Sequence, residues 1–85
     1  GERMVLEACH YVITPDDDEQ DWFEHPGEDF VYVLRGTLVI EFGDGQQAVL
    51  AAGDSIHHDG TVAHRWVLHG DEPAEALIVT AIPRT

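Results

Sequence analysis

The chain has 85 residues, and its 17 acidic and 4 basic side chains leave a formal net charge of −13. A surface this acidic repels phosphate, which argues against direct binding to nucleic acid or to an anionic membrane. The only cysteine, Cys9, excludes an intrachain disulfide and is compatible with the cytoplasm, where we expect the protein to be. No apolar run approaches the roughly 20 residues needed to span a bilayer.

The apolar content, 44% of residues, is enough for one small hydrophobic core. A chain of this length buries only about 60% of its unfolded surface and is marginally stable alone. We therefore expect one domain, residues 1–85, that belongs to a longer protein and associates as a homodimer.

Short apolar segments alternate with turn-forming residues along the whole chain, and no helical period is sustained. The expected strands are 3–13, 20–25, 30–35, 37–42, 46–50, 56–58, 64–69 and 76–82, and Pro83 is expected to end the last one. Turns are expected at 14–18, 43–45, 51–54, 59–61 and 70–73. Strands at this spacing predict an all-β sandwich or barrel.

Two stretches carry polar side chains suited to metal binding. In residues 22–36, His25 and Asp29 flank a Pro-Gly turn at the start of an apolar strand, whose two faces both read as buried. In residues 53–66, His64 begins a strand on which it shares a face with Trp66. Alternation with Ile56 also points His58 inward. If these faces line one interior, His64 converges on His25 and Asp29.

The same two stretches resemble the two motifs of the cupin family, and the similarity to the family covers nearly the whole chain. The segments Gly-Glu-Asp-Phe-Val-Tyr-Val-Leu-Arg-Gly and Ala-Gly-Asp-Ser-Ile carry the resemblance. His25 matches the second histidine of the first motif, Asp29 its acid and Gly36 its glycine, while Gly53 and His64 begin and end the second motif. The resemblance implies an all-β double-stranded β-helix, or jelly-roll barrel.

The chain departs from the family pattern at three places. Phe23 stands where the first histidine is usual, Asp29 stands where glutamate is usual, and Asp59-Gly60-Thr61 replaces Pro-x-Gly. A reduced set, His25, Asp29 and His64, remains to hold one divalent transition metal. Two histidines and one carboxylate suit Fe, and also Mn, Ni, Co or Zn. Alternatively, the two histidines only form hydrogen bonds to an organic ligand in a metal-free pocket.

Three further residues are expected at the pocket. Phe23 and Trp66 should flank the site and contact a bound ligand. His58 either adds a metal ligand or lines the pocket as a polar residue, and the second role is favoured. No residue is assigned as catalytic.

More narrowly, the chain resembles the C-terminal cupin domain of bacterial helix-turn-helix (XRE-type) transcriptional regulators. That likeness implies a sensor that binds a small-molecule effector and reaches DNA only through a helix-turn-helix domain absent from this sequence. The alternative is a small metal-dependent enzyme, an oxygenase, isomerase or epimerase, with a two-histidine, one-aspartate site as in the hydroxypropylphosphonate epoxidase type. A third interpretation, a structural dimerisation module, requires a pocket filled by side chains. The sequence favours the sensor over the enzyme.

Overall fold

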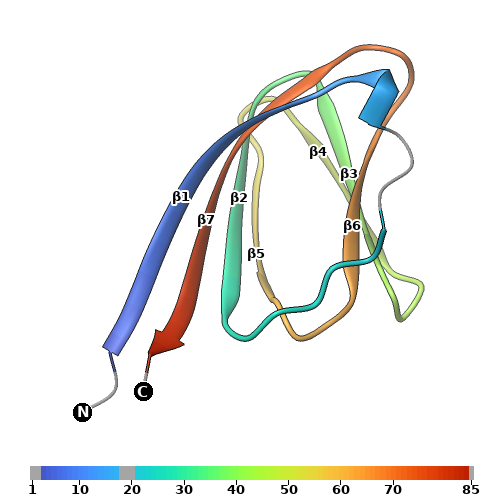
Figure 1. Cartoon of the computed structure of the whole chain (residues 1–85). Helices are drawn as coiled ribbons and strands as arrows, with labels where there is room; N and C mark the ends of the chain where they lie inside the picture. The colour runs from blue at the N-terminus through green and yellow to red at the C-terminus, as the bar shows by residue number, and fades with distance from the viewer. Residues whose placement is uncertain (1–2, 18–20, 85) are drawn as a thin grey trace.

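The computed structural model describes residues 3–17 and 21–84, and seven strands account for most of them (Figure 1). The strands are β1 (Arg3–Ile13), β2 (Glu28–Arg35), β3 (Thr37–Phe42), β4 (Gln47–Ala51), β5 (Ser55–Asp59), β6 (His64–Leu68) and β7 (Ala74–Arg84). A single 3₁₀ turn, η1 (Pro15–Asp17), lies in the expected turn after β1. No helix among these residues is long and apolar enough to cross a membrane.

The strands form two antiparallel sheets that face each other. One sheet has the order β1-β7-β2-β5, and the other has the order β4-β3-β6. In Figure 1 the first and last strands lie side by side along one edge, and the two sheets enclose a common interior. The predicted all-β jelly-roll barrel is therefore confirmed.

The core lies between the sheets because each strand turns alternate side chains inward. On β2 the residues Val31 and Val33 are fully buried, and they meet Leu38 and Ile40 from β3. Such burial of aliphatic side chains is the main favourable term in folding. The other members of the buried cluster are Ile13, Leu50, Ala74, Ala76 and Ile78.

The structure corrects the prediction that both faces of the β2 strand are covered. Phe30, Tyr32 and Leu34 point outward and are 42%, 37% and 37% exposed. Both faces are apolar in sequence, so alternation alone could not tell the core face from the outer one. Within the described chain nothing covers this outer sheet face.

Two strand boundaries also differ from the predictions. Residues 21–25 form no regular strand; only Phe23 makes an isolated bridge, to His64, and residue 20 lies outside the described residues. Pro83 does not end β7, which continues to Arg84 beside β1. The pairing of β7 with β2 ends at Ala81, so at Pro83 the strand is paired only with β1 and lies at a sheet edge, where proline is tolerated.

Candidate metal centre

The irregular segment before β2 brings His25 to the mouth of the barrel. Phe23 and His64 exchange backbone hydrogen bonds of 2.8 and 3.0 Å, and the His25 amide donates to the Gly60 carbonyl at 2.9 Å. These bonds hold the segment against the start of β6. His25 therefore faces His64, and their ring centroids lie 5.4 Å apart.

Two glycines permit this close approach. Gly27 has a φ of 95°, a left-handed conformation that side chains disfavour, and it turns the chain into β2. Gly60 is buried, and a Cβ at this position would collide with the imidazole of His25 and lie 2.8 Å from the His25 carbonyl oxygen. The glycine following Asp59 thus makes room for the first histidine of the site.

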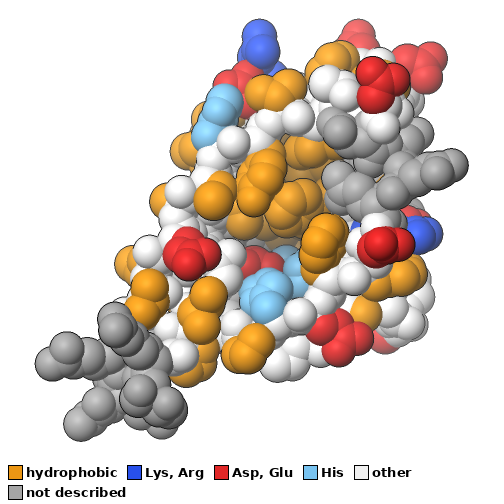
Figure 2. Space-filling view, viewed as in Figure 1, with side chains coloured by type: hydrophobic (Ala, Val, Ile, Leu, Met, Phe, Trp, Pro, Cys, Tyr) orange, Lys and Arg blue, Asp and Glu red, His pale blue; other side chains and the backbone are white. Residues whose placement is uncertain are grey.

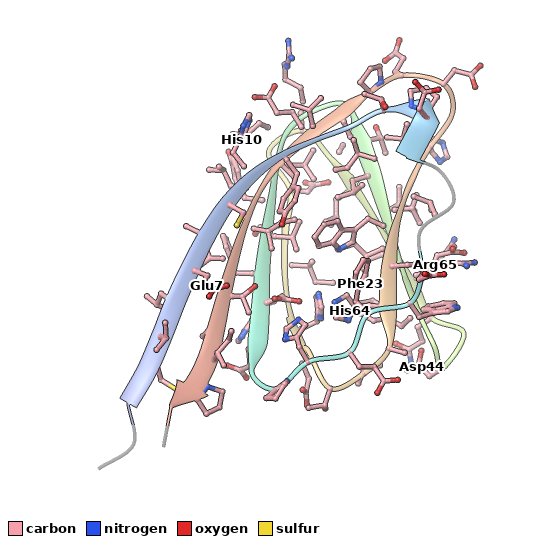
Figure 3. All side chains as sticks on the ribbon, in the orientation of Figure 1. Glu7, His10, Phe23, Asp44, His64 and Arg65 are labelled. Atoms are coloured by element: carbon pink, nitrogen blue, oxygen red, sulfur yellow. The ribbon has the colours of Figure 1, made fainter. Side chains whose placement is uncertain are left out.

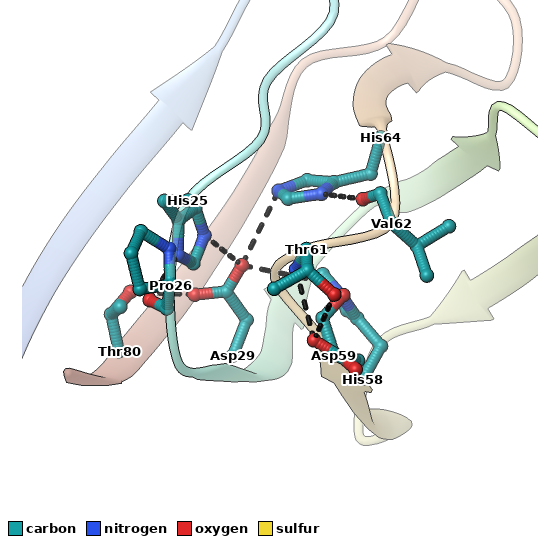
Figure 4. A network of polar contacts seen from close by, with 9 residues as sticks. All are labelled: His25, Pro26, Asp29, His58, Asp59, Thr61, Val62, His64 and Thr80. Carbon is teal, nitrogen blue, oxygen red and sulfur yellow. Dashed lines mark hydrogen bonds and ion pairs between the residues drawn. The ribbon is translucent and has the colours of Figure 1, made fainter. Parts of the chain in front are cut away.

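Asp29 is the centre of the polar cluster (Figure 4). Its side chain is 2% exposed, and its Oδ2 lies 2.9 Å from Nε2 of His25 and 3.3 Å from Nε2 of His64. One donor atom from each of these three residues lies within 4.8 Å of the other two. The structure thus brings together the three residues that the sequence selected as metal ligands. Aspartate is one methylene shorter than the glutamate that is usual at this position in the family motif, yet its Oδ2 still reaches both imidazoles.

The remaining polar atoms of the cluster have partners in the backbone or in the neighbouring strand. Nδ1 of His25 lies 3.0 Å from the Pro26 carbonyl, and Nδ1 of His64 lies 2.8 Å from the Val62 carbonyl. Thr80 donates its hydroxyl to Oδ1 of Asp29 at 2.6 Å. Contacts of this kind orient the ring nitrogens and carboxylate oxygens that ligate metals.

Two histidines of the site have perturbed pKa values. Burial alone would lower the pKa of His25, but the Pro26 carbonyl and the Asp29 carboxylate more than offset it, so the pKa of His25 is raised. Burial lowers the pKa of His58, and the neighbouring His64 acts in the same direction. A neutral His58 has a free lone pair on one ring nitrogen.

A pocket of about 450 Å³ opens above the cluster. Figure 2 looks into this hollow, where hydrophobic side chains form the walls and histidine and acidic side chains lie at one end. Phe23 and Trp66 line it with ring centroids 6.3 Å apart, and Tyr11 meets Trp66 edge-on at 5.4 Å. Figure 3 shows Phe23 and His64 pointing into the same interior.

The three residues predicted to contact a ligand do not all line the same pocket. Phe23 and Trp66 line the pocket, as expected, although Phe23 is 47% exposed rather than part of the core. His58 points inward but lies beside Asp29, and it lines a second, smaller pocket instead. That any of these residues contacts a ligand remains a prediction.

Sequence reasoning missed the wall of the pocket that β1 supplies. Glu7, Cys9, Tyr11 and Ile13 alternate along β1 and all line the pocket. Their period of two was a usable signal. It was missed because the order of the strands, which places β1 over the opening beside β7, cannot be read from alternation.

Two antiparallel sheets that enclose a pocket, with a histidine–aspartate cluster at one end of it, define a small β-barrel protein with a candidate binding site. The family model described as "Cupin domain" matches residues 9–80. The chain therefore belongs to the cupin family, as its motifs suggested.

Comparison with individual proteins supports the same fold. The uncharacterized protein YdbB of Bacillus subtilis (strain 168) is 44% identical over 48 residues, which are 55% of this chain and only 42% of YdbB. The crystal structure of TT1209 from Thermus thermophilus matches with a TM-score of 0.75 and 29% identity, covering 91% of this chain and 72% of TT1209.

A third similar structure is that of Fe(II) HppE in complex with substrate. It matches with a TM-score of 0.69 and 24% identity, over 91% of this chain and 45% of HppE. At this level of identity the likeness concerns the fold alone.

Proposed function

We propose that this chain is a metal-binding cupin domain that captures a small organic molecule in its barrel, with His25, Asp29 and His64 as metal ligands. The observation that carries the proposal is the orientation of the two imidazoles. A backbone carbonyl only accepts hydrogen bonds, so the contacts of the two Nδ1 atoms favour the tautomer that carries the proton on Nδ1. In a neutral ring, Nε2 then presents a lone pair to the Asp29 carboxylate.

Lone pairs that face a buried anionic oxygen repel it unless a cation lies between them. In the metal-free protein a proton on Nε2 of His25 can fill this role, in agreement with the raised pKa of His25. A divalent metal satisfies both nitrogens and the oxygen at once.

The pocket supports the second half of the proposal. Its volume of about 450 Å³ falls in the range typical of small-molecule sites, roughly 300–1,000 Å³. Its walls are largely aromatic and aliphatic, and the proposed metal ligands lie at its floor. An organic molecule held there would contact Phe23 and Trp66 and could bind the metal through an oxygen or nitrogen atom.

We infer a sensing role, in which ligand binding biases a partner domain that contacts DNA. The support is the resemblance to regulator cupin domains and the acidic surface, which suits a module that does not itself contact DNA. An unfilled pocket argues against the purely structural module, which requires side chains to occupy the interior.

An oxygen-dependent metal enzyme is the second candidate. Two histidines and one carboxylate with open positions form a donor set that suits Fe(II). The structure of Fe(II) HppE with substrate, at 24% identity, adds only that a protein with this fold can hold Fe(II) beside a substrate.

Elemental analysis of the protein, purified without chelator or polyhistidine tag, tests the proposal. We expect about one equivalent of a transition metal per chain after loading with Fe(II), Mn, Ni or Zn, and none in His64→Ala. Absence of metal after loading would overturn it. Ligand-dependent oxygen consumption by the Fe(II) form would favour the enzyme over the sensor.

A further inference from the structure

His58 is a buried histidine that the proposed metal site does not yet use. It lies on β5, its side chain is 7% exposed, and it is the register partner of Asp29 on β2. Directly paired residues of antiparallel strands project to the same face of the sheet. The pairing of β5 with β2 therefore delivers His58 to the side of Asp29.

One nitrogen of His58 has no hydrogen-bond partner. Its Nδ1 lies 3.3 Å from the carbonyl of Asp59, an acceptor, and this contact favours the tautomer with the proton on Nδ1. Its Nε2 is buried, unpartnered and 3.6 Å from Oδ2 of Asp29. Buried polar atoms without a partner are rare in proteins, and a nitrogen of this kind is free to bind a metal ion.

The same arrangement now occurs three times around one oxygen atom. His25, His58 and His64 each direct Nδ1 to a backbone carbonyl and Nε2 to Oδ2 of Asp29. The three distances from Nε2 to Oδ2 are 2.9, 3.6 and 3.3 Å, in that order. Metal–nitrogen and metal–oxygen bonds of about 2.0–2.1 Å place neighbouring donor atoms about 2.9–3.4 Å apart. These separations match two of the contacts, and that of His58 is slightly long.

We propose that His58 is a fourth protein ligand, which completes a site of three histidines and one aspartate around the metal held by His25, Asp29 and His64. The inference rests on the proposed function, since it requires that a metal binds. His58 is outside the group whose donor atoms all lie within 4.8 Å of one another, so its ring must shift toward the metal on binding.

The position of His58 determines which side of the metal stays open. His25, Asp29 and His64 line the large pocket, whereas His58 lines the smaller pocket on the other side of the cluster. With His58 holding the metal from that side, any remaining coordination positions would be open to a molecule bound in the large pocket.

A matched set of variants tests this inference. His58→Phe preserves a ring beside Phe42, whose centroid lies 5.2 Å away, and removes the nitrogen. His57→Ala is the control, because His57 is the adjacent residue and its side chain is 61% exposed on the outer face. His58→Gln is the substitute if the phenylalanine variant fails to fold, as judged by circular dichroism.

There are two readouts. Visible absorption measures the affinity for Co(II), and pulsed electron paramagnetic resonance counts the imidazoles coordinated to Cu(II). We expect three imidazoles in the native protein and in His57→Ala, but two in His58→Phe, with Co(II) affinity at least about tenfold weaker. Two imidazoles in the native protein, or unchanged affinity and spectrum in His58→Phe, would overturn the fourth ligand and leave the proposed function standing. No metal binding by the native protein would refute the proposed function itself, and this inference with it.

Discussion

Thr80 on β7 and Asp29 on β2 are register partners, and the Thr80 hydroxyl donates a 2.6 Å hydrogen bond to Oδ1 of Asp29. This bond fixes the plane of the carboxylate and leaves Oδ2 facing the histidines (Figure 4). Strand β7 carries no proposed metal ligand, yet through Thr80 it sets the orientation of Asp29, the central residue of the cluster.

Replacing Thr80 by valine should weaken metal binding by about tenfold. Valine has nearly the same shape but no hydroxyl, so the carboxylate of Asp29 loses its orienting donor. Isothermal titration with Zn or Co(II) measures the change. Thr37→Val, at the start of β3, is the control and should leave the affinity unchanged. Equal affinities in the two variants would mean that Thr80 does not position the site.

Metal should raise the thermal stability of the protein. A ligand that binds only the folded state at 100 times its Kd stabilises that state by about 2.7 kcal/mol. For a domain of this size each kcal/mol shifts the melting temperature by about 4–8 °C, so a rise of about 10–20 °C is expected. Differential scanning fluorimetry with and without EDTA measures it. A comparable rise in His64→Ala would show that the metal binds elsewhere.

Gly60→Ala should impair metal binding directly. The added methyl group would collide with the imidazole of His25, and φ at Gly60 is not in the left-handed region, so the effect is steric. Gly53→Ala supplies the contrast: it has no neighbour within 4 Å but a φ of 91°. That strain should cost about 1–2 kcal/mol of stability. We expect Gly53→Ala to melt earlier with normal metal affinity, and Gly60→Ala to lose affinity. Normal affinity in Gly60→Ala would contradict the close approach.

Glu75 should give the fold a pH-dependent stabilisation. It bonds His10 on β1 at 2.6 Å and Arg35 on β2 at 2.7 Å, and these contacts lower its pKa below the ordinary 4.5. A lowered pKa in the folded state stabilises the protein above pH 4.5, and the effect is lost as the pH falls through the folded value. Glu75→Gln should therefore melt earlier than the native protein at pH 7.

The difference in melting temperature between Glu75→Gln and the native protein should shrink at pH 3, as the native carboxylate takes up its proton. Glu72→Gln, an exposed acid of the turn before β7, is the control and should follow the native protein at both pH values. An equal deficit for Glu75→Gln at pH 7 and pH 3 would exclude the ionic contribution.

Much of the fold could be read from the chain because strands and turns are local. Glycine, proline and aspartate fall between short alternating segments, and each strand of the described chain starts within two residues of an expected start. The resemblance to the two cupin motifs selected His25, Asp29 and His64, which the structure clusters. The strands and turns depend on neighbours in sequence, where geometry is set by φ, ψ and side-chain alternation. His64, far from Asp29 in sequence, was selected by its place in the second motif.

The tertiary structure decided what local geometry leaves open. Only the register of β5 against β2 places His58 across from Asp29, and only the sheet order places Tyr11 over the pocket. The outer face of β2 looked buried in sequence because its residues are apolar, yet no layer covers it in the described chain. Sequence period determines which side chains share a face, while the pairing of distant strands determines what that face meets.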